Sequence, residues 1–165
     1  LDFGTLLGIY RDGALIPWDN DADISIHGDD VEILWKVKSQ LPFKYRLSPR
    51  YNSTKWIPGK YRVFKLKYWY QKPLRFLKRK ELHIDIFVKY KVDNYYYWIS
   101  CGSPKRVKSH YHDTSESINW HGNTYNIPSD TKKYLTELYG DWKTPIRNYD
   151  SSVEEGTICD TIQYK

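Results

Sequence analysis

Three aspartates separated by single residues, Asp19, Asp21 and Asp23, form the densest acidic group in the 165-residue sequence. If residues 21–26 form a strand, Asp21 and Asp23 project from one face with their backbones about 7 Å apart. Carboxylates held this close repel each other unless a cation lies between them. Hard cations such as Mg²⁺ bind carboxylate oxygens together with the phosphate oxygens of a substrate. The spacing therefore indicates a divalent-cation site, although an isolated Asp-x-Asp is more often an acidic surface turn.

A calcium loop of the EF-hand type is a second interpretation of this segment, because Asp30 is the twelfth residue counted from Asp19. The sixth position of such a loop needs glycine for a sharp turn, and Ile24 stands there. A β-branched side chain strongly disfavours a positive φ. We therefore reject the calcium loop.

A carboxylate on a later strand is expected to complete the site. Residues 81–90 alternate between apolar and polar positions, which predicts a strand with His83 and Asp85 on its polar face. A lone carboxylate there is costly to bury and must reach water, a base or a metal. We predict Asp21, Asp23 and Asp85 as metal ligands and catalytic residues, a triad typical of nucleotidyltransferase-type enzymes. For His83 a proton relay is possible in principle, but a structural role is the more common one.

Five positions near the first acidic group are candidates for substrate binding. A turn at Gly4 and Thr5 would let the backbone approach a phosphate closely. Arg11 is either a bidentate phosphate ligand or a surface cation after a helix. Trp18 either stacks on a base or sugar or belongs to the core, and Asp19 lies within the same segment.

The elements that must position these residues are strands in the middle of the chain and helices near both ends. Helices are predicted over 6–10, from Asp29 or Asp30 to Gln40, and over 128–139, and strands over 21–26, 60–70, 81–90 and 95–100, with a hairpin of 118–121 and 125–127. This order predicts an α+β domain, with a mixed β-sheet flanked by helices. We expect one domain over 1–145 and a polar tail over 146–165.

Charge, cysteine count and hydropathy narrow the protein class. The net charge is +6, and the segment from Lys55 to Lys80 contains ten basic residues and no acidic one. This basic stretch is either a binding surface for an anion or a solvated strand face. Cys101 and Cys159 are too few for a disulfide framework, and core thiols are favoured over a single disulfide. No apolar run is long enough to span a membrane. Because the sequence contains no methionine, we expect it to be part of a longer protein.

Three segments resemble the LicD/fukutin family. The first is LDFGTLLGIYRDGALIPWDNDADISI at 1–26, and it is followed by HIDIF at 83–87 and NIPSDTKKYLTELYGDWKTP at 126–145. The resemblance implies a nucleotidyltransferase-like fold. It also implies transfer of a phospho-alcohol, such as phosphocholine or ribitol phosphate, from a CDP-activated donor to a hydroxyl of a glycan or glycoconjugate, with release of CMP.

The same resemblance implies Mg²⁺ or Mn²⁺ on Asp21, Asp23 and Asp85, and a phosphate-side turn at Gly4 and Thr5. Two rival functions remain: a nucleotidyltransferase that adds a nucleotide to an acceptor, and a non-catalytic domain that binds polyanions through the basic stretch. No nucleic-acid partner is expected, because three convergent carboxylates repel a phosphate backbone. Membrane attachment is expected only through segments outside this chain. The compartment is open: the Golgi lumen for a eukaryotic parent protein, the cytoplasm for a bacterial one.

Overall fold

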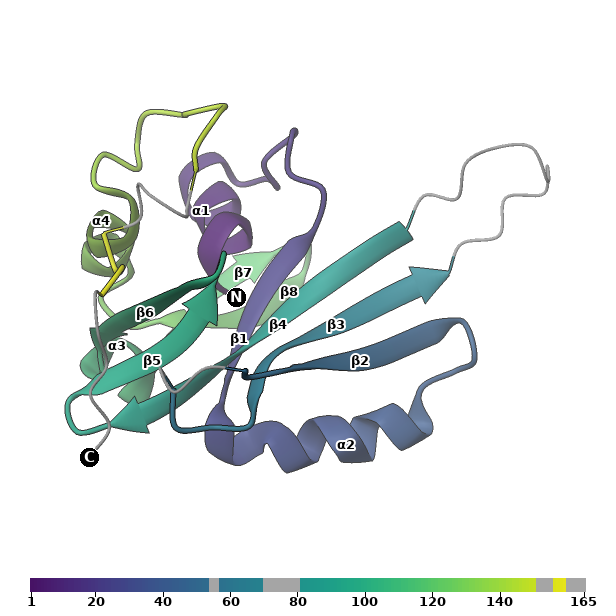
Figure 1. Ribbon diagram of the computed structural model, residues 1–165. Coiled ribbons are helices and arrows are strands. Elements are labelled where there is room, and N and C mark those ends of the chain that lie inside the picture. The colour runs from purple at the N-terminus through teal and green to yellow at the C-terminus, as the bar shows by residue number, and fades with distance from the viewer. Residues whose placement is uncertain (54–56, 70–80, 151–155, 160–165) are drawn as a thin grey trace.

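The computed structural model describes residues 1–53, 57–69, 81–150 and 156–159, and these residues form a mixed β-sheet with helices on both faces (Figure 1). The described strands of this sheet are β1 (Ala22–His27), β2 (Tyr45–Tyr51), β3 (Tyr61–Trp69), β4 (Glu81–Val92), β5 (Tyr95–Ser100) and β6 (Ser103–Lys108). The order is β2-β3-β4-β5-β6 with antiparallel neighbours, and β1 pairs with β4 in parallel. A separate hairpin consists of β7 (Ser115–Trp120) and β8 (Asn123–Pro128). The predicted α+β class is confirmed.

The helices divide between the two faces of the sheet. They are α1 (Phe3–Asp12), α2 (Val31–Gln40), α3 (His110–Asp113) and α4 (Thr131–Tyr139), with a 3₁₀ turn at Gly28–Asp30 before α2. Figure 1 shows α2 along one face and α1 and α4 beyond the other. On the α2 face, Val31 packs with Phe64 and Ile86 in one core cluster. On the opposite face, Leu6, Trp98 and other buried side chains of α1, β5 and α4 form a second cluster.

The period-two alternation of β1 and β4 places the charged residues on the face opposite α2. In the parallel register Asp23 lies beside Asp85, and Ile24 lies beside Ile86. The isoleucines pack toward the α2 cluster, so successive residues point the other way. The two aspartates therefore meet on one face, as the sequence predicted.

The first helix begins earlier than predicted. Gly4 and Thr5 do not form a turn, because they lie in the first turn of α1. Asp2 is the N-cap residue, and its carboxylate accepts a hydrogen bond from the Phe3 amide at 2.9 Å. Asp30, one of the two predicted start positions of α2, is its N-cap residue, although its side chain makes no capping hydrogen bond.

Strands β2 and β6 were not predicted, since their segments carry proline and several charges. Pro49 lies in β2, which stands at one edge of the sheet, and Pro104 lies in β6 at the other edge. An edge strand tolerates proline because one side needs no hydrogen-bond donor. Sequence alternation alone therefore misses such strands.

The predictions for the cysteines, the basic stretch and the C-terminal tail are confirmed only in part or remain untested. Cys159 is buried and Cys101 is exposed, and neither forms a disulfide, so the core-thiol interpretation holds for Cys159 only. Half of the basic stretch, including 70–80, lies outside the described residues. In the predicted tail, the Gly156 amide donates to the Leu138 carbonyl at 2.9 Å. The domain boundary at 145 stays a prediction. Among the described residues no helix has the length and hydropathy to span a membrane.

Candidate active site

Four acidic residues predicted from the sequence converge at the start of β1. Carboxylate oxygens of Asp19, Asp21 and Asp23 all lie within 4.8 Å of one another. A second group, Asp21, His83 and Asp85, satisfies the same limit. Asp21 belongs to both groups, so it joins them into one site, which we call the aspartate cluster (Asp19, Asp21, Asp23 and Asp85).

The first turn of α1 positions this cluster. The Thr5 hydroxyl accepts a hydrogen bond from the Asp23 amide at 2.8 Å, which fixes the start of β1. A Cβ at Gly4 would lie 2.6 Å from Asp19 Oδ2, closer than a carbon and an oxygen can pack. Glycine at this position therefore leaves room for the Asp19 carboxylate. Thr5 is buried, whereas Gly4 lines a cavity beside the cluster.

Asp85 is the most buried member of the cluster, at 8% exposure. Its Oδ2 accepts a hydrogen bond from Lys65 Nζ at 2.7 Å, because the β3–β4 register places the two residues side by side. Its Oδ1 is buried and accepts no hydrogen bond from any residue that the structure describes. An unpaired buried carboxylate oxygen costs free energy, and a bound cation would remove that cost.

His83 joins the site, although it was not among the predicted ligands. Its Nε2 lies 3.1 Å from Asp21 Oδ2. The spacing of two residues between His83 and Asp85 on one strand was the signal in the sequence. His83 therefore contacts the acidic site directly, where the sequence favoured a structural role.

The electrostatics of the cluster reflect an excess of negative charge. Burial, followed by the charges of Asp21 and Asp19, raises the pKa of Asp23 to about 8. Partial burial and the neighbouring Asp21 also raise the pKa of Asp19 above its ordinary range. Carboxylates are ligands of hard divalent cations, and an imidazole is a common ligand of transition metals, so this donor set suits a divalent cation. Together with the unpaired Oδ1 of Asp85, these observations show that the residues fit a divalent metal ion.

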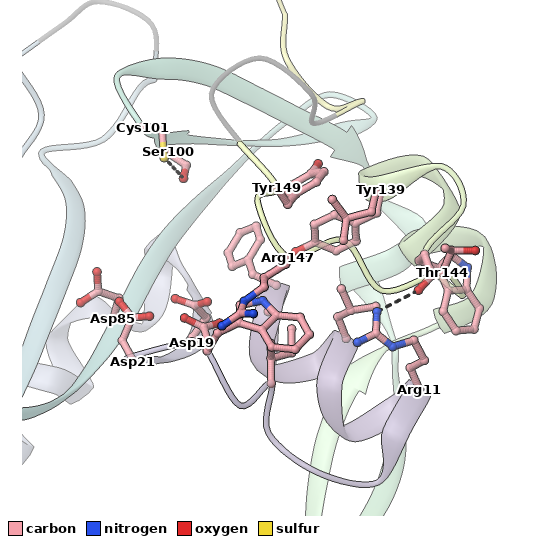
Figure 2. A pocket seen from close by; sticks show the side chains of 18 of the residues that line it. Arg11, Asp19, Asp21, Asp85, Ser100, Cys101, Tyr139, Thr144, Arg147 and Tyr149 are labelled. Carbon is pink, nitrogen blue, oxygen red and sulfur yellow. Dashed lines mark hydrogen bonds between the residues drawn. The ribbon is translucent and has the colours of Figure 1, made fainter.

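A cavity of about 430 Å³ opens beside the aspartate cluster (Figure 2). Its opposite wall consists of aromatic, apolar and cationic side chains, among them Tyr139, Trp142, Ile146, Arg147 and Tyr149. All of these follow the start of α4 in the sequence. The cavity is therefore acidic at one end, and the other wall is largely aromatic and contains both Arg147 and Asp141.

Arg11 and Trp18 both line the cavity. The Arg11 guanidinium already forms a bidentate pair with Asp12, with Nε–Oδ1 and Nη2–Oδ2 distances of 2.9 and 2.7 Å. Trp18 is 41% exposed, so the alternative that placed it in the core is wrong. Its indole remains available for a ligand.

The family comparison agrees with this geometry. The model of the LicD/FKTN/FKRP nucleotidyltransferase domain matches residues 1–130. The chain belongs to the LicD family. No curated protein sequence matches the chain. The matched residues include the aspartate cluster, His83 and Lys65, whereas the aromatic and cationic wall after α4 lies beyond them. Membership of the LicD family indicates a transferase of the phosphotransferase type that acts on glycans.

Proposed function

We propose that the chain transfers a phospho-alcohol from a CDP-activated donor to a glycan hydroxyl, releases CMP, and depends on a divalent metal ion. The observation that carries the proposal is the buried, unpaired Oδ1 of Asp85 beside Asp21 and His83. A divalent cation would satisfy this oxygen, and the same cation would serve a phosphate-transfer reaction. The cavity volume of about 430 Å³ also lies within the range of small-molecule sites.

The proposed roles follow from the positions of the side chains. Asp21, Asp23 and Asp85 would hold Mg²⁺ or Mn²⁺, which neutralises the donor diphosphate and stabilises the leaving phosphate. Asp85 also borders the cavity, where it takes the proton of the attacking hydroxyl. Trp18 offers an exposed aromatic face to the base or sugar of the donor.

The proposed reaction is one substitution at phosphorus. The acceptor oxygen forms a bond to the phosphorus that carries the alcohol, and the bond from that phosphorus to the bridging oxygen breaks. The bridging oxygen and its electron pair leave with CMP. Positioning and charge neutralisation dominate the catalysis of such transfers.

The decisive experiment incubates the protein with Mg²⁺, a glycan acceptor and a panel of nucleotide diphospho-alcohols. We expect CMP release from a CDP-linked donor, its loss in EDTA, and its return on addition of Mg²⁺ or Mn²⁺. Each of Asp21→Asn, Asp23→Asn and Asp85→Asn should lower turnover at least about 100-fold, as loss of a metal ligand does. Asp93→Asn, in an exposed turn, is the matched control and should keep full activity.

Two outcomes would contradict the proposal. Near-normal turnover in any two of the three cluster variants would remove the triad from the mechanism. Transfer of the nucleotide itself to the acceptor, with release of the alcohol phosphate, would identify the rival nucleotidyltransferase.

A further inference from the structure

The wall of the cavity after α4 contains an arginine that neither the family match nor the proposed metal site uses. We propose that Arg147 binds a phosphate of the nucleotide donor, and that the segment Thr144–Tyr149 is the second half of the donor site. This proposal rests on the proposed function, because it assigns the donor within the same cavity. Residues 144–149 lie beyond the match to the LicD family at 1–130.

The two arginines of the cavity differ in what they already bind. Arg11 pairs with Asp12 and donates to the Trp142 carbonyl at 3.3 Å, and its side chain is only 9% exposed. Arg147 lines the same cavity, yet it forms no hydrogen bond or ion pair with any described residue. Its guanidinium carries five N–H donors in a planar fork that matches two phosphate oxygens. Arg147, rather than Arg11, is therefore the cation that is ready for an anionic ligand.

Its location places this cation opposite the metal ligands. Figure 2 shows Arg147 between Asp19 and the two tyrosines Tyr139 and Tyr149. A diphosphate bound next to the aspartate cluster brings negative charge to a region that already has an excess of it. A divalent ion offsets part of this charge on one side of the phosphates, and a guanidinium on the other side offsets more. Charge balance therefore favours a phosphate between the cluster and Arg147.

The segment that carries Arg147 is held in place by the core. The Trp142 side chain is buried, and its Nε1 donates to Thr136 Oγ1 at 3.1 Å. The rings of Tyr139 and Tyr149 meet edge to face, with centroids 5.2 Å apart. These contacts attach the chain on both sides of Arg147 to α4. The backbone that carries Arg147 is thus positioned before a ligand arrives, whereas its exposed side chain is ordered only on binding.

The test measures equilibrium binding of CMP and of cytidine to the whole chain in Mg²⁺, by isothermal titration calorimetry. We expect Arg147→Gln to weaken CMP binding about tenfold or more, because a charge-assisted contact is lost. Cytidine, which has no phosphate, should bind Arg147→Gln as it binds the wild type. Arg147→Lys should restore part of the CMP affinity. Arg50→Gln, an exposed arginine on β2, is the matched control and should change neither affinity.

The outcomes separate this proposal from the proposed reaction. If no donor is turned over, but CMP binding depends on Arg147 and cytidine binding does not, the reaction fails and the phosphate site stands. If the wild type releases CMP from a donor while Arg147→Gln binds CMP normally, the phosphate site fails and the reaction stands. Equal weakening of CMP and cytidine, or no CMP binding to the wild type, would also overturn the phosphate site.

Discussion

Two charged clusters occupy the same face of β1 and β4, and they differ in charge balance. The first, the lysine cluster, consists of Asp2, Ser25, Lys89, His112 and Tyr134, and the second is the aspartate cluster. Lys89 is fully buried, and its Nζ lies 2.6 Å from Asp2 Oδ2 and 2.9 Å from the Tyr134 hydroxyl. The Asp2 carboxylate also accepts hydrogen bonds from Tyr134, at 2.5 Å, and from Ser25. Because the Asp2 amide donates to the Asp23 carbonyl at 3.2 Å, the two clusters are direct neighbours.

The pKa values of the two clusters move in opposite directions. Burial alone would raise the pKa of Asp2, but the charge and hydrogen bond of Lys89 outweigh burial and hold it well below its usual range. Among the residues that the structure describes, no comparable cation offsets the burial of Asp23, and the pKa of Asp23 rises to about 8. A buried carboxylate that has its own ammonium group is part of the fold. A buried carboxylate surrounded by other acids takes up either a proton or a cation from solution, and such a group suits a metal site.

The largest expected effect on stability comes from removing the cation of the lysine cluster. Lys89→Met leaves the Asp2 carboxylate buried without its cation and should lower the free energy of unfolding by about 3–5 kcal/mol. Urea unfolding at pH 7, followed by circular dichroism, measures the loss. The control is Lys91→Met, two residues further along β4, which breaks an exposed pair with Asp113 and should cost at most about 1 kcal/mol. Equal losses in the two variants would contradict the structural role of the lysine cluster.

A substitution in the aspartate cluster is expected to lower metal affinity without lowering the stability of the fold. In the metal-free fold the Asp23 carboxyl must take up a proton near neutral pH, and Asp23→Asn removes this cost, so the variant should be at least as stable as the wild type. Its affinity for Mn²⁺, measured by calorimetry, should fall about 10–100-fold, because a ligand is lost. A marked loss of stability in EDTA with unchanged Mn²⁺ affinity would assign Asp23 to the fold instead of the site.

The sequence predicted the aspartate cluster better than the lysine cluster. Alternation along β1 and β4 was enough to place Asp23 and Asp85 on one face, since the period of a strand is fixed. The pairing of Lys65 with Asp85 depends on the register between β3 and β4, which the sequence does not encode locally. The lysine cluster was missed for a related reason. Its ion pair joins residues 87 positions apart, and a single buried lysine looks like any other polar position of a strand.

The sequence pattern also did not predict the C-terminal side of the cavity. Residues 146–165 are as a whole polar and aperiodic, which is typical of a tail, yet Ile146, Arg147 and Tyr149 line the cavity. Their position follows from tertiary contacts, such as the burial of Trp142 and the contact between Tyr139 and Tyr149. Helix and strand periodicity do not report such contacts.

A smaller effect should appear in the pH dependence of stability of the metal-free protein. The folded pKa of Asp23 is about 8, above its unfolded value, so its contribution is present at low pH and is lost as pH rises toward 8. Burial and the nearby Lys89 lower the folded pKa of His112 to about 3, so its contribution is lost as pH falls below about 6.5. Between about pH 4 and 6.5, the contributions of Asp23 and His112 change the free energy of unfolding in opposite directions as the pH rises.

Asp23 therefore dominates over His112 between about pH 6.5 and 8. In EDTA, the free energy of unfolding of the wild type should decrease with pH in this window relative to that of Asp23→Asn. Urea titrations of both proteins at half-unit pH intervals measure the difference. Parallel curves for the two proteins would show that Asp23 is ionised in the metal-free fold, contrary to the excess of negative charge around it.

The smallest expected effect is that of Gly4→Ala, which changes the packing around the aspartate cluster but should hardly change the stability of α1. In Gly4→Ala the new Cβ would meet Asp19 Oδ2 at 2.6 Å, so the Asp19 carboxylate must move. Asp19 is exposed and shifts at little cost, and alanine favours the helix by up to about 1 kcal/mol. Stability should therefore stay within about 1 kcal/mol of the wild type. Mn²⁺ affinity should fall a fewfold, because Asp19 is held away from Asp21 and Asp23. Unchanged Mn²⁺ affinity in a folded Gly4→Ala protein would limit the metal site to Asp21, Asp23, His83 and Asp85, and the glycine would then serve only the packing of α1 against the loop before β1.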